Sequence, residues 1–198
     1  CNGCGKNTVR ECGGVFMEIL DIVDEAGFPT GETADRVRVH AEGLLHRTAH
    51  VWLLRRRNGR AEVLLQRRSE NKESCPGCWD ISSAGHIPAG MGFVESALRE
   101  LREELGLTAS ADELVRCGRR RFFYRETFHG RPFVDNQISD VYALWRDVRA
   151  EELAIQTDEL DAVRWMPFDE LVHAVAHGTM RHCIVREELE ILRCALGL

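Results

Sequence analysis

The sequence contains no long apolar run. Nowhere in its 198 residues is there a stretch close to the roughly 18 apolar residues that a membrane-spanning helix needs, and the opening residues include no apolar segment of the secretory type. Either kind of segment would have indicated a membrane or exported protein. We therefore expect a cytoplasmic protein with no membrane contact.

An excess of positive charge is also absent. The formal net charge is -6, from 26 Lys and Arg residues against 32 Asp and Glu residues. A chain with this balance has no broad positive field to release counterions from a nucleic-acid backbone. We expect no long nucleic acid as a partner, so phosphate groups would be bound by local Arg and Lys side chains or by metal ions.

Cysteine is plentiful, but the spacing of a zinc ribbon is missing. Three cysteines occur singly in ordinary periodic segments: Cys117, Cys183 and Cys194. Reduced thiols are the simpler interpretation. The alternative is a structural zinc site that draws on Cys1, Cys4 and Cys12 together with the pair Cys75 and Cys78.

The composition favours one globular domain, since 44% of the residues are hydrophobic and 29% are charged. We predict that this domain covers residues 17–198 and ends in a C-terminal helix. Residues 1–16 would form an N-terminal extension that is poorly ordered.

Hydrophobic periodicity predicts an α/β fold. Apolar alternation predicts strands over residues 15–23, 49–54, 61–66, 114–124, 138–145 and 160–166. Helical spacing predicts helices over residues 93–105, 168–176 and 181–196. Asn58 and Gly59 favour a hairpin turn between the second and third strands, while residues 24–31 have the composition of a turn. This order indicates a mixed sheet with helices on both faces.

Three glutamates in the first predicted helix carry the strongest chemical signal. Glu100, Glu103 and Glu104 stand at i, i+3 and i+4, which places their carboxylates on one face. Their repulsion costs a few tenths of a kcal/mol per pair, roughly, and becomes favourable when a hard cation such as Mg²⁺ binds between the oxygens. On the opposite face we expect three leucines to pack against the sheet: Leu98, Leu101 and Leu105. The alternative is a solvated acidic face paired with Arg99 and Arg102.

The context of these glutamates resembles the Nudix box, the signature of the Nudix hydrolases. The matching positions are Gly85, Arg99, Glu100, Leu101, Glu103, Glu104, Gly106 and Leu107. The resemblance implies a Nudix-type α/β/α sandwich with a mixed β-sheet and a requirement for Mg²⁺ or Mn²⁺. It also implies that Glu100, Glu103 and Glu104 are catalytic metal ligands, with Gly85 as a further ligand.

One position departs from the family pattern. The family usually has a glutamate six residues after Gly85, where this sequence has Met91. In the family that position supports the loop, so the change bears on loop rigidity and rate. Glu95 is a candidate substitute, with a plain surface glutamate as the alternative. For the catalytic base, the resemblance favours Glu100, and Glu159 is a second candidate.

The similarity extends to the branch that contains the type I isopentenyl diphosphate isomerases. Arg68 and Lys72 match isomerase positions that hold the diphosphate, and a guanidinium with an ammonium group suits that anion. The two acid–base positions of the isomerases are occupied here by Ala84 and Gln137, which cannot transfer protons. This difference favours hydrolysis over isomerisation.

Other clusters are open to more than one interpretation. His40, His46 and His86 correspond approximately to metal-binding histidines of the isomerases, so they form either a second metal site or a set of structural histidines. The basic and aromatic residues 119–124 either help to bind a nucleotide or form a solvated strand edge. Cys75 and Cys78 have redox-pair spacing, although the intervening Pro and Gly suit a turn.

The function expected from these features is metal-dependent hydrolysis of a diphosphate linkage in a small molecule such as a nucleoside diphosphate or its derivative. The nearest rival is an isopentenyl diphosphate isomerase-like enzyme. A noncatalytic Nudix ligand sensor is a third possibility, raised by Met91. A homodimer is compatible with the sequence.

Overall fold

The computed structural model describes residues 10–12, 15–72, 74–128 and 130–198. Within the expected extension, strand β1 (Arg10–Cys12) pairs antiparallel with β2 (Val15–Met17). The rest of the extension lies outside the described residues, and so do Cys1 and Cys4 of the proposed zinc site.

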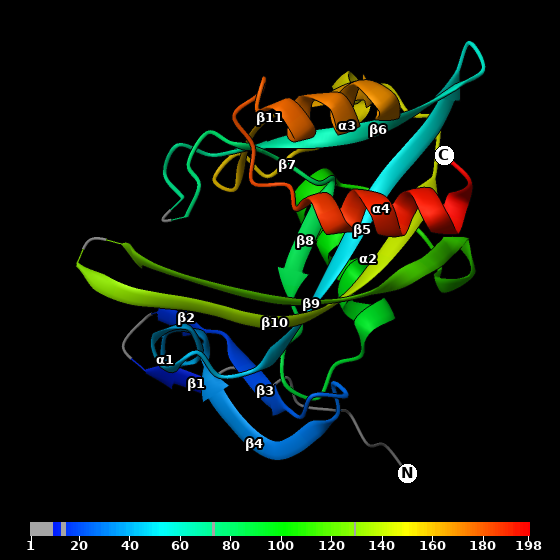
Figure 1. Ribbon diagram of the computed structural model, residues 1–198. Helices are drawn as coiled ribbons and strands as arrows, with labels where there is room; N and C mark the ends of the chain where they lie inside the picture. The colour runs from blue at the N-terminus through cyan, green and yellow to red at the C-terminus, as the bar shows by residue number, and fades with distance from the viewer. Residues whose placement is uncertain (1–9, 13–14, 73, 129) are drawn as a thin grey trace.

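A sheet of seven strands forms the centre of the molecule (Figure 1). Five strands follow the order β11-β6-β5-β10-β9, while β7 pairs with β6 and β8 pairs with β5. Their bounds are β5 His46–Arg57, β6 Arg60–Arg68, β7 Trp79–Asp80, β8 Ser83–His86, β9 Leu114–Phe128, β10 Arg131–Trp145 and β11 Leu160–Pro167. Strand β10 runs parallel to β5, whereas the other pairs are antiparallel, so the predicted mixed sheet is confirmed.

The hairpin between β5 and β6 follows from two residues. Asn58 and Gly59 adopt φ angles of 50° and 78°, the left-handed region that a tight hairpin turn requires. The register then places Leu54 opposite Val63. This part of the sequence prediction is confirmed.

Helices cover both faces of the sheet. Helix α2 (Phe93–Leu105) packs on one face, and α3 (Phe168–His177) and α4 (Arg186–Leu196) pack on the other (Figure 1). Strand β5 serves both cores by alternation, since Val51 and Leu53 contact the α2 side while Trp52 and Leu54 contact the other. The chain therefore forms the expected α/β/α sandwich.

Several elements differ from the sequence prediction. The strand expected over residues 15–23 is divided at Glu18 into β2 and β3 (Ile19–Val23), and β3 pairs with β4 (Pro29–Asp35) beside the main sheet. Helix α1 (Arg36–Glu42) was not predicted at all. The last helix begins at Arg186 rather than at residue 181. Among the described residues, no helix is long and apolar enough to cross a membrane.

Candidate active site

A cavity of about 1330 Å³ collects most of the residues that the sequence singled out. Side chains from α1, α2, α4 and from strands β5 to β11 line it, together with the loop that follows β6 and the loops that precede β11 and α4. The sequence-predicted residues on its wall are His40, Arg68, Lys72, Gly85, His86, Glu100, Glu103, Glu104 and Glu159. Residues far apart in the sequence thus share one cavity.

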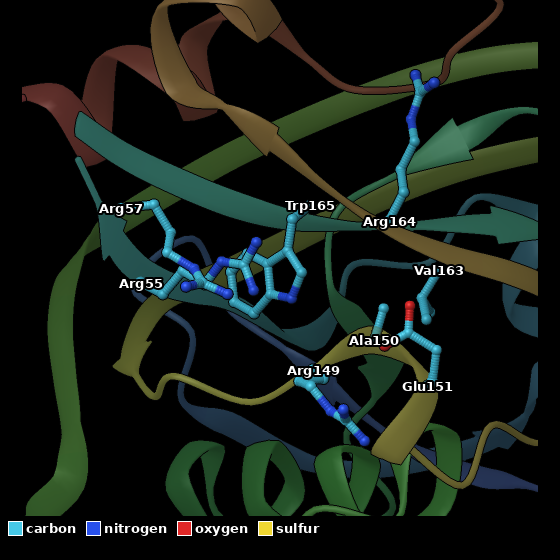
Figure 2. Close-up of a pocket in the computed structure, with 8 residues that line it drawn as sticks. All are labelled: Arg55, Arg57, Arg149, Ala150, Glu151, Val163, Arg164 and Trp165. Carbon is cyan, nitrogen blue, oxygen red and sulfur yellow. The ribbon is translucent and has the colours of Figure 1, made fainter.

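A second, smaller cavity of about 350 Å³ contains none of these residues (Figure 2). Its wall is dominated by arginines, and the Arg55 guanidinium lies 4.2 Å from the centre of the Trp165 ring. Such stacking holds the cation on the protein itself. The chemistry predicted from the sequence therefore belongs to the larger cavity.

Gly85 and helix α2 bring two carboxylates onto strand β8. A Cβ atom at Gly85 would lie 2.1 Å from the carboxylate carbon of Glu100, so only glycine permits this approach. At the preceding residue, the Ala84 amide donates to Glu104 Oε2 over 3.2 Å. Gly106 ends the helix with a φ of 66°, as its position after the last periodic residue predicted.

The three glutamates differ in their exposure to solvent. The Glu100 and Glu103 side chains are 12% and 46% exposed, whereas Glu104 is buried at 8%. Burial is the largest influence on the first and last of these, raising the pKa of Glu100 to about 7 and that of Glu104 to about 8. Neighbouring glutamates add to both increases. The site therefore holds two carboxyl groups that are unfavourable as uncompensated anions.

The burial of Glu104 corrects one expectation about the helix. Ala97, Leu101 and Leu105 are fully buried in the core, whereas Leu98 is only partly buried. The buried stripe runs through positions i, i+4, i+7 and i+8 from Ala97, and Glu104 is the i+7 member. A glutamate on the apolar stripe is thereby directed at the sheet instead of solvent.

Arginine pairing, the alternative interpretation of the acidic helix, occurs in part. The Arg99 guanidinium contacts the Glu100 carboxylate, lies 3.8 Å from Glu103 and donates to the His86 carbonyl over 3.2 Å. Arg102 makes no ion pair among the described residues. One guanidinium does not neutralise three carboxylates, and a set of oxygen donors suits Mg²⁺ or Mn²⁺. The residues present therefore fit a divalent cation.

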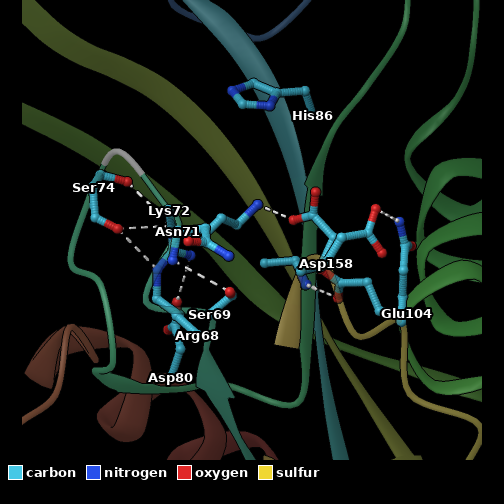
Figure 3. Close-up of polar contacts among 12 residues, drawn as sticks. Arg68, Ser69, Asn71, Lys72, Ser74, Asp80, His86, Glu104 and Asp158 are labelled. Carbon is cyan, nitrogen blue, oxygen red and sulfur yellow. Dashed lines mark hydrogen bonds and ion pairs between the residues drawn. The ribbon is translucent and has the colours of Figure 1, made fainter. Parts of the chain in front are cut away.

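Two cations on the other side of this site are held by local contacts (Figure 3). Arg68 donates to the Ser74 carbonyl over 3.0 Å and lies 3.4 Å from Asp80. The Lys72 ammonium contacts the Glu159 carboxylate. Burial is the main cause that lowers the pKa of Lys72, and nearby Arg68 adds to it. The candidate phosphate-binding groups and the second candidate base thus lie side by side.

The three histidines also come together. The Nε2 atoms of His40 and His86 are 3.2 Å apart, and one ligand atom from each of His40, His46 and His86 lies within 4.8 Å of the others. Among the described residues, these three histidines bring their possible ligand atoms within 4.8 Å of one another, whereas the carboxylate oxygens of the three glutamates do not come together in this way. Burial is the main cause that lowers the pKa of each, to about 4 for His40. A lowered pKa keeps the imidazoles neutral, which is the form that binds metals. The second metal site at these histidines stays a hypothesis.

Sequence reasoning missed a buried ion-pair network beside the cavity. Glu188 of α4 accepts hydrogen bonds from His50 Nδ1 at 3.0 Å and Trp52 Nε1 at 2.9 Å, and Arg120 Nε lies 3.6 Å away. Burial alone would raise the pKa of Glu188, but His50, the Arg120 guanidinium and the hydrogen bonds from His50 and Trp52 hold it at about 2. The only sequence signal was a glutamate beside Leu189 at the start of an apolar helical stripe.

The basic and aromatic segment 119–124 divides between two faces. Arg119 and Arg121 bind Asp140 and Glu25 at 2.6 and 3.1 Å, on the side away from the cavity. Arg120, Phe122 and Tyr124 line the cavity. Strand alternation therefore places Arg119 and Arg121 on one face and the cavity-lining residues on the other, and nucleotide binding by this segment stays a prediction.

The thiols of this region are free. Cys75 and Cys183 line the cavity, and Cys78 is buried nearby. A hydrogen bond with Cys183 is the main cause that lowers the pKa of Cys75 to about 6. No disulfide joins the cysteines whose side chains the structure describes.

Comparison with known proteins gives consistent matches. A family model described as NUDIX domain matches residues 44–186. The chain is 38% identical over 157 residues to Nudix hydrolase 3 of Arabidopsis thaliana, a match that covers 77% of this chain and 20% of that much longer protein. It is 30% identical over 162 residues to an isopentenyl-diphosphate Delta-isomerase of Corynebacterium diphtheriae, with 80% and 84% of the two chains covered. A crystal structure of a Deinococcus radiodurans protein superposes with a TM-score of 0.64 at 20% identity, covering 90% of this chain and 99% of the other.

Proposed function

Because the chain belongs to the Nudix family and is a hydrolase of that family, we propose that it hydrolyses the diphosphate linkage of a small molecule, with a nucleoside diphosphate or its derivative as substrate. The proposed cofactor is Mg²⁺ or Mn²⁺. Glu100, Glu103 and Glu104 would hold the cation, and Gly85 would be a further ligand.

One observation carries this proposal: buried carboxylates and cations line the same cavity. Glu100 and Glu104 lie against β8, and Arg68 and Lys72 lie on the wall of the same site. A guanidinium and an ammonium group bind phosphate oxygens, while carboxylates of raised pKa gain the most from a bound cation. The carboxylates can therefore bind the metal cation of a metal–diphosphate complex, and Arg68 and Lys72 can bind its phosphate oxygens.

The protein groups have separate roles in the proposed reaction. Arg68 and Lys72 would orient the diphosphate, and Glu100, the residue that the family resemblance favours as base, would accept a proton from the attacking water. When bound, the divalent cation supplies charge neutralisation and a more acidic water. Glu159 is held by Lys72, which makes it the weaker candidate for the base.

The cavity opposes the isomerase alternative. Ala84 and Gln137 both line the cavity, so the two positions that would require proton-transfer groups carry a methyl and an amide. Neither transfers protons at ordinary pH. Hydrolysis requires neither.

A phosphorus NMR screen of diphosphates tests the proposal. With Mg²⁺ or Mn²⁺, wild-type protein should release a phosphate product, and Glu103→Gln and Glu104→Gln should each lower the rate about 100-fold. Arg102→Gln is the matched control, since Arg102 is exposed on the same helix and does not line the cavity. Circular dichroism should show that all three variants retain the fold.

The outcomes separate the rival functions. Conversion of isopentenyl diphosphate to its isomer without phosphate release would contradict hydrolysis. Metal-loaded protein that binds nucleotides but cleaves none across the panel would identify a sensor.

A further inference from the structure

One side of β9 faces the cavity beyond the glutamates. Arg120, Phe122 and Tyr124 alternate along this strand and line the cavity. On the neighbouring strand β10, Gln137 stands opposite Phe122 and Asp135 stands opposite Tyr124, and both also line the cavity. These five residues are called the β9 recognition face below.

Buried polar atoms on this wall lack partners among the described residues. Arg120 is 3% exposed, and its Nε and Nη1 atoms have no hydrogen-bond partner, although Glu188 Oε2 lies 3.6 Å away. Asp135 Oδ1 on β10 has no hydrogen-bond partner either, although His46 Nε2 lies 3.8 Å away, and the same holds for Gln66 Oε1 on β6, which lines the same cavity. Buried polar groups are normally satisfied. The wall therefore offers both donors and acceptors to a ligand.

Two aromatic rings flank these polar groups. The Phe122 and Tyr124 rings are nearly parallel, at 12°, with centres 6.4 Å apart. The two rings therefore present nearly parallel faces along one side of the strand, on which a flat group can stack. The Arg120 guanidinium lies 4.7 Å from the Phe122 ring centre. The polar groups and the aromatic rings of the β9 recognition face are therefore in direct contact.

We propose that the β9 recognition face binds the nucleobase of the substrate, an inference that rests on the proposed function for the position of the diphosphate. A nucleobase is flat and presents donors and acceptors on its edge, as stacking on Phe122 and Tyr124 and pairing with Arg120 and Gln137 require. An alkyl chain would leave the unpartnered atoms of Arg120 and Gln66 unsatisfied. A further phosphate would offer acceptors alone and would lie near Asp135 and Glu188.

Ligand-observed NMR tests base binding apart from hydrolysis. Saturation-transfer difference spectra are recorded with adenosine, guanosine, cytidine and uridine monophosphates without metal, so that no cleavage is involved. We expect the base protons of at least one nucleotide to receive the strongest saturation. Phe122→Leu and Tyr124→Leu should each weaken the Kd at least about 5-fold. Phe123→Leu is the matched control, because Phe123 is 58% exposed on the same strand and does not line the cavity.

Each outcome bears on one of the two proposals. If the base protons receive no saturation, or if all three leucine variants bind alike, the β9 recognition face does not bind a nucleobase. A kcat/KM for a simple alkyl diphosphate above that for every nucleoside diphosphate would also overturn the inference. Base binding by a protein that cleaves no diphosphate would uphold the β9 recognition face and refute the proposed function.

Discussion

At the scale of single residues, the most consequential groups are the two carboxyls of α2 that lie against β8. Glu100 and Glu104 have pKa values raised to about 7 and about 8, mainly by burial. A carboxyl whose pKa is raised in the folded state favours folding below its ordinary pKa, and this contribution is lost as pH rises through the folded value. Without metal, the protein should therefore lose stability as pH rises from about 4.5 through 8.

Metal binding should reverse this loss, because the cation competes with the protons of the same carboxyls. We predict that saturating Mg²⁺ raises the Tm more at pH 9 than at pH 6, measured by differential scanning calorimetry with EDTA-treated protein as reference. The double variant Glu100→Gln, Glu104→Gln should show the same small shift at both pH values. An equal shift for wild-type protein at pH 6 and pH 9 would contradict the assignment of these carboxyls as ligands.

Cys75 provides an independent residue-scale prediction. Its pKa is lowered to about 6, chiefly by the hydrogen bond with Cys183, whereas burial raises the pKa of Cys117 to about 11. Since the thiolate is the reactive form, iodoacetamide at pH 7 should modify Cys75 much faster than Cys117. Peptide mass spectrometry over time measures both rates. In Cys183→Ala the half-maximal pH for Cys75 should move upward, and an unchanged profile would rule out the hydrogen bond as the cause.

At the scale of elements, α4 is fixed to the sheet by Glu188. This carboxylate is 1% exposed and binds His50 and Trp52 of β5. Removing one member of a buried ion pair leaves the others uncompensated. The helix therefore depends on a charge as well as on its apolar stripe.

Glu188→Gln should lower the free energy of unfolding by about 3 kcal/mol at pH 7, measured by urea denaturation. The exposed neighbour Glu187→Gln is the control and should change little. Because the pKa of Glu188 is lowered, its contribution is present above about pH 4.5 and is lost as pH falls toward about 2. The difference between wild type and Glu188→Gln should shrink over that interval, and a constant difference would exclude a charge effect.

At the scale of the whole molecule, the sequence predicted what depends on local pattern. Helix α2, its end at Gly106 and the hairpin at Asn58 and Gly59 all follow from neighbouring residues. Helix α1 was missed because Val37 and Val39 alternate as in a strand, while Asp35 and Gly43 cap a single short helix.

Long-range pairing was beyond the sequence alone. His50 and Glu188 are 138 positions apart, and nothing in either segment indicates the other. Likewise, the alternation of residues 119–124 was visible, but which face would meet a cavity depends on the strand partners. The glutamates could be proposed as ligands from their spacing, whereas the burial that distinguishes Glu104 from Glu103 depends on packing against β8.

The glutamates lie on α2 beside β8, whereas Phe122 and Tyr124 lie on the hairpin of β9 and β10. This difference in position affects which substitutions the fold tolerates. Figure 1 shows the paired ends of β9 and β10 extending past the helical layers. Phe122 and Tyr124 belong to neither of the two large hydrophobic cores. Exchanging these two side chains should therefore cost little folding energy, so on the proposed function the preference for a nucleobase can change while the glutamates of α2 stay the same.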